Sequence, residues 1–178
     1  MARVIVLLCS EEFVKNISSI ADNLSGKYLL SALREAQEIH LQGVIGSALL
    51  DKCKVLVKDD ELDSEGNEHY AELVERCRYF LAYSTIAECV MKVSYKVANA
   101  GVVRTVDESV QVPTFSEVSL VKKEYQSKAD YYCYELQKWL RHNYSLFHEL
   151  SANDGSRISA HLRDGATCSI FLGGARGK

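Results

Sequence analysis

The stretch from about Glu68 to Ala98 constrains the fold of this 178-residue chain most, because it predicts a long helix that is apolar on nearly all sides. Two rows of apolar side chains run along it at helical spacing and leave one narrow polar stripe. The stripe consists of Arg78, Thr85, Glu88 and Lys92. A helix of this kind has to pack on several sides at once. We therefore expect it at the centre of a mainly α-helical, multi-helix domain, where it buries Phe80, Leu81, Ala87 and Met91.

Four further helices are expected around the central one, from apolar periodicity and capping residues. Ser10 precedes a short helix that has two acidic residues in its first turn, which favours an N-terminus there. In the next helix, only Gln37 interrupts the apolar stripe. The expected helices cover residues 11–20, 27–45, 47–57 and 117–143.

The segment from Gly101 to Ser116 alternates without a helical period and contains the only proline, Pro113. We interpret it as an extended, hairpin-like insertion before the last long helix. Short β-strands are expected near both ends of the chain, at Arg3–Leu8 and Cys168–Leu172, because both runs are apolar and too short for a helix.

Beyond Ser151 the sequence has no helical stripe and contains five glycines. This composition is typical of an extended arm and not of a second domain. The predicted organisation is therefore a helical domain over residues 1–150, with its insertion at about 101–116, followed by a C-terminal arm over residues 151–178.

Composition restricts the classes of function. The net charge of −3 and the pI near 6.0 argue against a protein that grips DNA or an anionic membrane through an excess of basic residues. The apolar run near the N-terminus is too short for a signal peptide or a membrane span, so we expect a protein that is made and used in the cytoplasm. The six cysteines show no C-x-x-C spacing, which favours buried, reduced thiols.

Three motifs hint at chemistry, and each lacks an essential part. The ending "GGARGK" resembles a phosphate-binding loop, but the first glycine is replaced by Leu172 and no Ser or Thr follows. His148 and Glu149 lack the second histidine of a zinc motif. The acidic loop at residues 59–72 fits a calcium loop only in part, and a solvated turn is the favoured interpretation. We expect no enzymatic activity, no catalytic residue, no metal site and no cofactor.

Aromatic residues gather in the last helix, beside Lys128, Lys138 and Arg141. They are Tyr131, Tyr132, Tyr134 and Trp139. Such a cluster could stack on nucleic acid bases. Packing in a core or an interface is the favoured interpretation, because aromatic side chains at helical spacing most often serve that purpose.

The order of elements and three stretches of sequence carry a resemblance to a known class. The stretches are "CSEEFVKNISSIADNLSGKYLLSALREAQEIHLQGVIGSALL", "FLAYSTIAECVMKVSYKVANAGVVRT" and "SEVSLVKKEYQSKADYYCYELQKWL", within residues 9–140. Here the chain resembles the head–tail connector proteins, or head-completion adaptors, of tailed phages and prophages. It is most similar to those of Bacteroides-type and crAss-like phages.

The resemblance implies a structural protein of the virion neck. Such a protein forms a ring, commonly of twelve copies, below the portal, where it extends the DNA channel and joins capsid to tail. Its partners would be further copies of itself, the portal protein and adjacent neck or tail rings. Phage DNA would pass through without sequence-specific binding, and no membrane would be involved. Assembly would take place in the host bacterial cytoplasm.

Two alternatives stay open at this point. One is another neck or tail layer of the same virion, because sequence does not order the layers. The other is a small cytosolic helical factor that processes nucleic acid, which the Tyr- and Lys-rich last helix favours.

Interface residues are expected where apolar side chains lie in segments that cannot bury them alone. These segments are the two short terminal strands and the insertion, together with two basic residues at the end of the arm that would meet acidic partners. The expected interface residues are Val4, Val6, Leu8, Val103, Val106, Val110, Val112, Phe115, Ile170, Phe171, Arg176 and Lys178.

Overall fold

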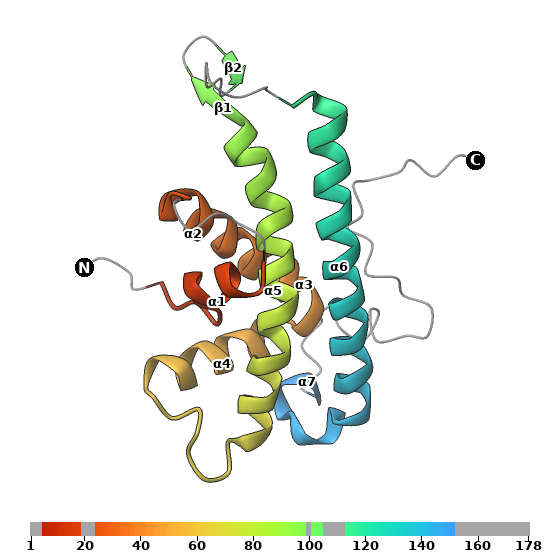
Figure 1. Ribbon diagram of the computed structural model, residues 1–178. Helices are drawn as coiled ribbons and strands as arrows, with labels where there is room; N and C mark the ends of the chain where they lie inside the picture. Colours follow the sequence, from red (N-terminus) through yellow and green to blue (C-terminus); the bar gives the residue numbers. More distant parts are fainter. Residues whose placement is uncertain (1–4, 19–23, 99–100, 105–112, 152–178) are drawn as a thin grey trace.

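The computed structural model of the chain describes residues 5–18, 24–98, 101–104 and 113–151, and these form a mainly helical domain, as the sequence predicts (Figure 1). The elements, in chain order, are α1 (Glu11–Asn16), α2 (Gly26–Glu35), the π-helix η1 (Ala36–Leu41), α3 (Gln42–Ile45), α4 (Ser47–Lys58), α5 (Glu68–Ser94), β1 (Tyr95–Ala98), β2 (Gly101–Arg104), α6 (Phe115–His142), the 3-10 helix η2 (Tyr144–Leu146) and α7 (His148–Ser151).

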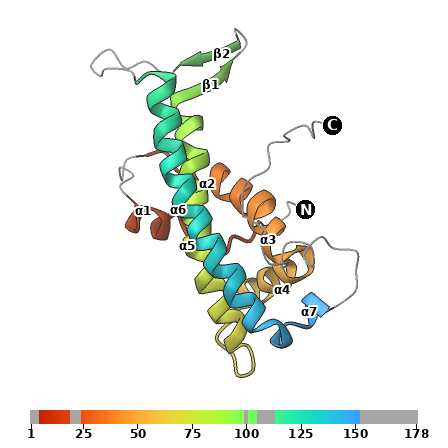
Figure 2. The same cartoon turned by 90° about the vertical axis from the view of Figure 1, so that its right-hand side faces the viewer.

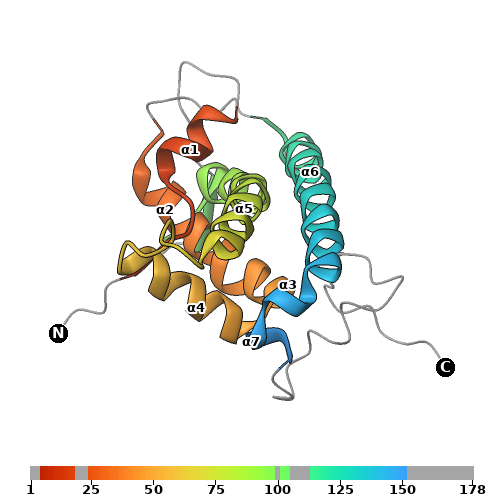
Figure 3. The same cartoon turned by 90° about the horizontal axis from the view of Figure 1, so that it is seen from below.

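Helix α5 lies at the centre, between α1 and α2 on one side and α6 on the other (Figure 3). Phe80 and Leu81 are buried, which agrees with the expectation for a helix without a wide polar face. Ala87 is buried as well, whereas Met91 is only half-buried. The reason is that the last turns of α5 extend with α6 beyond the other helices, so fewer neighbours cover them (Figure 1).

Helix α6 runs antiparallel to α5 along almost its full length (Figures 1 and 2). Its N-terminus is fixed by a capping box. The Oγ1 atom of Thr114 accepts a hydrogen bond from the Glu117 N–H at 3.3 Å, and the Glu117 carboxylate accepts one from the Thr114 N–H at 2.6 Å. The helix therefore begins two residues earlier than its predicted start at Glu117, and Phe115 belongs to it and not to an insertion.

Helices α2, η1 and α3 form one continuous helical segment that ends at Gly46, in agreement with the prediction for residues 27–45. Gly46 has φ of +83°, a conformation that glycine adopts without steric cost, and α4 begins directly after it. The wider turns of η1 were not predicted, because a π-helix has no distinct hydrophobic period over six residues.

The predicted central helix is too long at its C-terminal end. The chain turns into an extended conformation at Tyr95, and β1 pairs antiparallel with β2 in the register Tyr95 with Arg104 and Ala98 with Gly101. Figure 2 shows this pair at the far end of the α5–α6 helices. The run from Tyr95 to Val97 has strong β-propensity, and its main chain pairs with β2 in place of a further helical turn.

The structure describes only some of the extended segments that the sequence predicts. No strand forms in residues 5–8 of the expected N-terminal strand. Half of the expected insertion, residues 105–112, lies outside the described ranges, as do the strand at 168–172 and the arm from residue 152 onward.

The first prediction tests the central position of α5. The change Phe80→Ala is expected to lower the free energy of unfolding by about 3–5 kcal/mol, because it leaves a cavity in a core that cannot fully collapse. Chemical denaturation measures this value. The control is Leu120→Ala on the exposed side of α6, which should change stability by less than about 0.5 kcal/mol. Equal, small effects of both changes would contradict the burial of α5.

Candidate functional site

The cysteines of the domain are unsuited to nucleophilic chemistry. Burial raises the pKa of both Cys9 and Cys53 to about 12, despite opposing contributions from nearby cations. Burial also raises the pKa of Cys77 and Cys89. These four thiols are free, as the sequence predicts, and they are protonated at neutral pH, so they serve as small apolar core residues. Cys133 of α6 is disulfide-bonded, so the prediction that all six cysteines are reduced is wrong at this position.

The acidic loop between α4 and α5 is held by its own main chain and side chains. The Asn67 amide donates a hydrogen bond to the carbonyl of Glu61 at 2.8 Å, and the Glu68 carboxylate accepts one from the Gly66 N–H at 3.1 Å. Glu72, the last position of the partial calcium motif, pairs instead with Arg76. Within the part of the chain that the structure describes, no group of His, Cys, Asp or Glu is arranged to hold a metal ion.

The outer side of α6 exposes apolar side chains that no other element of the described chain covers. We call Leu120, Val121, Tyr131 and Tyr134 the α6 face. Leu120 is 69% exposed, Tyr131 60% and Tyr134 54%. Their spacing places these three on one side of the helix, opposite the residues that pack on α5. A shallow depression of about 520 Å³ beside this side is lined by Tyr83, Lys128 and Tyr131, among others.

Behind the α6 face, a stack of tyrosines joins α6 to α5. The Tyr132 ring lies between the rings of Tyr79 and Tyr83, with centroid distances of 5.4 and 5.3 Å and nearly parallel planes. Phe13 of α1 contacts the edge of Tyr79 at 5.4 Å. The stack thus ties three helices together and supports the exposed Tyr131, whose ring meets Tyr132 edge-on.

The predicted aromatic cluster of the last helix is therefore divided between two roles. Tyr132 and Trp139 belong to the packing, since Trp139 contacts Phe147 at 5.8 Å and the Arg76 guanidinium at 5.0 Å. Only Tyr131 and Tyr134 are directed outward. This division favours the packing interpretation over a continuous surface for stacking bases.

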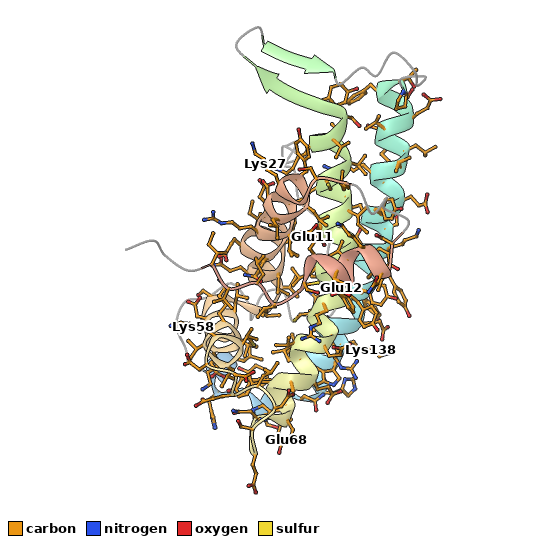
Figure 4. All side chains as sticks on the ribbon, turned by 60° about the vertical axis from the view of Figure 1, so that its left-hand side comes forward. Glu11, Glu12, Lys27, Lys58, Glu68 and Lys138 are labelled. Atoms are coloured by element: carbon orange, nitrogen blue, oxygen red, sulfur yellow. The ribbon has the colours of Figure 1, made fainter. Side chains whose placement is uncertain are left out.

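A second surface lies on the other side of the molecule, where the N-terminal segment crosses α2, η1 and α4. We call it the N-terminal groove. It has a volume of about 590 Å³, and its apolar floor includes Ile5, 52% exposed, and Val55, 50% exposed. Its lining residues are Ile5, Val6, Arg34, Glu38, Asp51, Lys54, Val55 and Lys58. Lys58 of this groove and Lys138 of α6 lie on opposite sides in Figure 4.

Gln37 fixes the N-terminal segment in place. Its fully buried side-chain amide accepts a hydrogen bond from the Leu8 N–H at 2.9 Å and donates one to the Val6 carbonyl at 2.9 Å. The Leu8 carbonyl also accepts a bond from the Arg78 guanidinium at 3.3 Å. A buried glutamine requires hydrogen-bonding partners of this kind. The position of Gln37 in an apolar stripe was therefore a signal in the sequence for such a contact, although the helical pattern alone did not show where the partners lie.

A network of polar side chains joins the π-helix η1 to α5 and α6. His40 Nε2 lies 3.3 Å from the carboxylate of Glu88, and Lys122 of α6 lies 3.8 Å from the same oxygen. The hydrogen bond with His40 is the main factor that lowers the pKa of Glu88, and burial opposes it. Lys92 pairs with Glu35 at 2.7 Å one turn away. Of the polar stripe predicted for the central helix, Glu88 and Lys92 therefore form ion pairs with α2, η1 and α6, whereas Thr85 bonds to the Leu81 carbonyl within α5.

The expected interface residues fall in different environments. Val6 lines the N-terminal groove, and the side chain of Leu8 is buried. Phe115 is exposed, and its ring lies edge-on to the ring of Tyr95 with a centroid distance of 6.3 Å. Val103 lies on β2, opposite Lys96. The remaining expected residues lie outside the described part of the chain: Val4, Val106, Val110, Val112, Ile170, Phe171, Arg176 and Lys178. Of the α6 face, Tyr131 and Tyr134 were predicted to pack in a core or an interface, whereas Leu120 and Val121 were not among the expected interface residues.

The chain belongs to a protein family of unknown function, DUF6712, whose sequence profile matches residues 41–159. The matched region contains α4 through α7 and therefore includes the α5–α6 pair and the α6 face. Neither the curated proteins nor the solved structures gave a match.

No helix in the described ranges is both long enough and apolar enough to cross a membrane.

The second prediction concerns Gln37. Replacement by Ala is expected to lower the free energy of unfolding by about 1–3 kcal/mol, because the buried Leu8 N–H loses its acceptor. Hydrogen exchange of the Leu8 amide should accelerate at the same time, since the segment is no longer held. Gln126→Ala on α6 is a matched control that should leave both measurements unchanged. Unaltered exchange at Leu8 in the Gln37 variant would show that other contacts fix the segment.

The third prediction concerns pH. Because the folded-state pKa of Glu88 is lowered, its contribution to stability is present above the unfolded-state pKa and is lost as the pH falls through the folded-state value. Glu88→Gln should therefore be less stable than the wild type at neutral pH, and this difference should shrink in acid. Denaturation curves at several pH values measure it. Glu72→Gln, at an exposed pair, should show little difference at any pH.

Proposed function

We propose that the chain is a structural protein of a tailed phage or prophage, which forms a ring in the neck between capsid and tail and extends the DNA channel below the portal. The proposal combines the sequence resemblance with one structural observation. A single domain exposes apolar side chains on two different surfaces, the α6 face and the N-terminal groove, on opposite sides of α5 (Figure 3).

This arrangement supports a ring because of how identical subunits associate. A contact between two different surfaces of the same protein repeats from copy to copy, and it closes into a ring when the rotation between neighbours allows it. A protein with one self-complementary patch would instead form a two-fold dimer. Exposed aromatic and leucine side chains such as Tyr131, Tyr134 and Leu120 are typical anchors of protein interfaces.

The charge of the chain is compatible with a DNA channel. A lumen with strong positive charge would bind the phosphate backbone and slow the passage of DNA. The chain carries a net charge of −3, and most of its exposed basic residues near the α6 face are paired, such as Lys128 with Glu124 at 2.7 Å. Such a surface suits passage without sequence-specific binding.

A different layer of the neck or tail is supported by the same observations, and the experiment below separates it from the layer next to the portal. The nucleic-acid-processing alternative has weaker support. It depends on a continuous aromatic surface in α6, and Tyr132 and Trp139 are engaged in packing.

The fourth prediction tests this function directly. The chain is expressed together with a portal protein from the same genome, and the product is imaged by electron cryo-microscopy. We expect a ring of this chain stacked on the portal ring. A ring that binds the tail side of another adaptor, and not the portal, would assign it to a different layer. A chain that remains monomeric with the portal and all neighbouring neck proteins would overturn the proposal.

The α6 face supplies a matched pair of variants for this experiment. Tyr131→Ser with Leu120→Ser should abolish the ring, because two exposed anchors are lost, while the melting temperature stays close to that of the wild type. Leu30→Ser with Ile39→Ser, which removes two exposed apolar side chains of α2 and η1 outside both surfaces, is the control that should assemble normally. Assembly of the Tyr131 and Leu120 variant would show that α6 is not at the interface.

A further inference from the structure

The hairpin formed by β1 and β2 stands apart from the helical domain. It lies at the far end of the α5–α6 pair, beyond the other helices (Figure 2). Within the described ranges, its contacts are mainly between its own two strands and with the end of α5. A sheet of only two strands is marginally stable in water, and it gains stability from a third strand or from packing against a helix. The hairpin is therefore an element that a further strand would complete.

Both outer edges of the hairpin are open among the described residues. The two strands pair only with each other, in the register from Tyr95 with Arg104 to Ala98 with Gly101. In an antiparallel pair, the main-chain groups of alternate residues point away from the partner strand. Apart from the bond between the Tyr95 N–H and the Met91 carbonyl, no main-chain hydrogen bond within the described ranges joins either strand to another element. Edges of this kind are templates for a strand from another chain.

A second copy of the chain supplies a strand with the required direction. Neighbours in a closed ring are related by a rotation, which is about 30° for the twelve copies that the resemblance implies. The β1 strands of two neighbours therefore run nearly parallel, and β1 of one copy is antiparallel to β2 of the next. Adjacent strands of a sheet are themselves turned by about 20–25°. A rotation of this size is within the natural twist of two strands.

A closed ring of hairpins also accounts for both edges at once. Two hairpins that pair through β1 alone would form a four-stranded sheet whose outer edges stay open. When every β2 pairs with the β1 of the next copy, no edge remains. Twenty-four strands at a spacing of about 4.8 Å give a circumference of about 115 Å and a diameter of about 37 Å between backbones. An opening of this size admits a DNA duplex.

The base of the hairpin adjoins the N-terminal end of α6. Phe115, the first residue of α6, is 63% exposed, and its ring lies edge-on to that of Tyr95. Leu120 of the α6 face follows less than two turns later. Because all copies in a ring share one orientation, a neighbour that packs on the α6 face presents its own hairpin at the same end. The helix contact and the strand contact therefore support the same assembly.

We propose that β2 of one copy pairs antiparallel with β1 of the next, in the register of the hairpin itself, so that the hairpins form one continuous sheet around the ring. The inference rests on the proposed function in that it requires a ring of identical copies. It adds to that function the element that forms the wall of the channel at the hairpin end.

Disulfide crosslinking of the full-length protein tests the contact. Two single variants, Val97→Cys in β1 and Val102→Cys in β2, are mixed in equal amounts and assembled with the portal protein. These positions are opposite each other in the hairpin register. Opposite residues have Cα atoms about 4.5–5.5 Å apart, which is within reach of a disulfide. Because each chain carries only one of the two new cysteines, we expect a disulfide-linked dimer in the mixture and in neither variant alone.

The controls distinguish this contact from other associations. A mixture of Leu30→Cys and Ile39→Cys, at exposed positions of α2 and η1, should stay unlinked. A dimer from Val97→Cys alone would show β1 paired with β1 about a two-fold axis, and a dimer from Val102→Cys alone would show the same for β2. Either of these results, or no link in any sample, would overturn the proposal.

Hydrogen exchange gives an independent measurement without substitutions. The outer N–H groups of β1 and β2 are open in the free chain and bonded in the continuous sheet, so their exchange should slow by about tenfold or more on assembly. The acidic loop between α4 and α5, at the other end of α5, is the control and should exchange at an unchanged rate. Equal exchange of the hairpin in the free and assembled states would contradict the added strand.

The outcomes also separate this inference from the proposed function. A ring on the portal without links between Val97→Cys and Val102→Cys chains would retain the neck function and remove only the continuous sheet. Linked and protected hairpins in a ring that ignores the portal and the neck proteins would retain the sheet and remove the function. A chain that stays monomeric would remove both.

Discussion

The burial of α5 on nearly all sides is the constraint on which the rest of this structure depends. A helix without a wide polar face has to be enclosed, and here α1 and α2 cover one side while α6 covers the other. Two charged residues in the second half of α5 are accommodated by pairing with other helices: Glu88 with His40, and Lys92 with Glu35. Because only one side of α6 packs on α5, the apolar side chains on its opposite side are exposed.

Gln37 shows how one buried polar residue determines the arrangement of a neighbouring segment. Its amide cannot stay in the core without hydrogen-bonding partners, because an unsatisfied buried amide is costly. The main chain at Val6 and Leu8 supplies these partners, so the segment is held against η1.

The helical core was predictable because its signals are local and repeated. The all-round apolar pattern of residues 68–94 and the Ser10 cap both led to elements that the structure contains. The end of α5 was not predictable in the same way, since Tyr95 to Val97 fits either a helix or a strand, and the pairing with β2 decides between them. The start of α6 was misplaced because the Thr114 capping box was overlooked in favour of a nearby serine.

The candidate surfaces were harder to predict than the core, for a reason that lies in the geometry. Whether Tyr131 is exposed and Tyr132 is stacked depends on the rotation of α6 against α5, which adjacent residues in the sequence do not reveal. The N-terminal groove combines side chains from α2, η1, α4 and the N-terminal segment, so no single stretch encodes it. Two surfaces of this origin, on opposite sides of one buried helix, are held at a fixed angle to each other by the core between them. That fixed angle is what a closed ring requires, because a small error in each contact would accumulate around the ring and leave it open. The tight packing of α5 is therefore the part of the fold that makes a defined assembly possible.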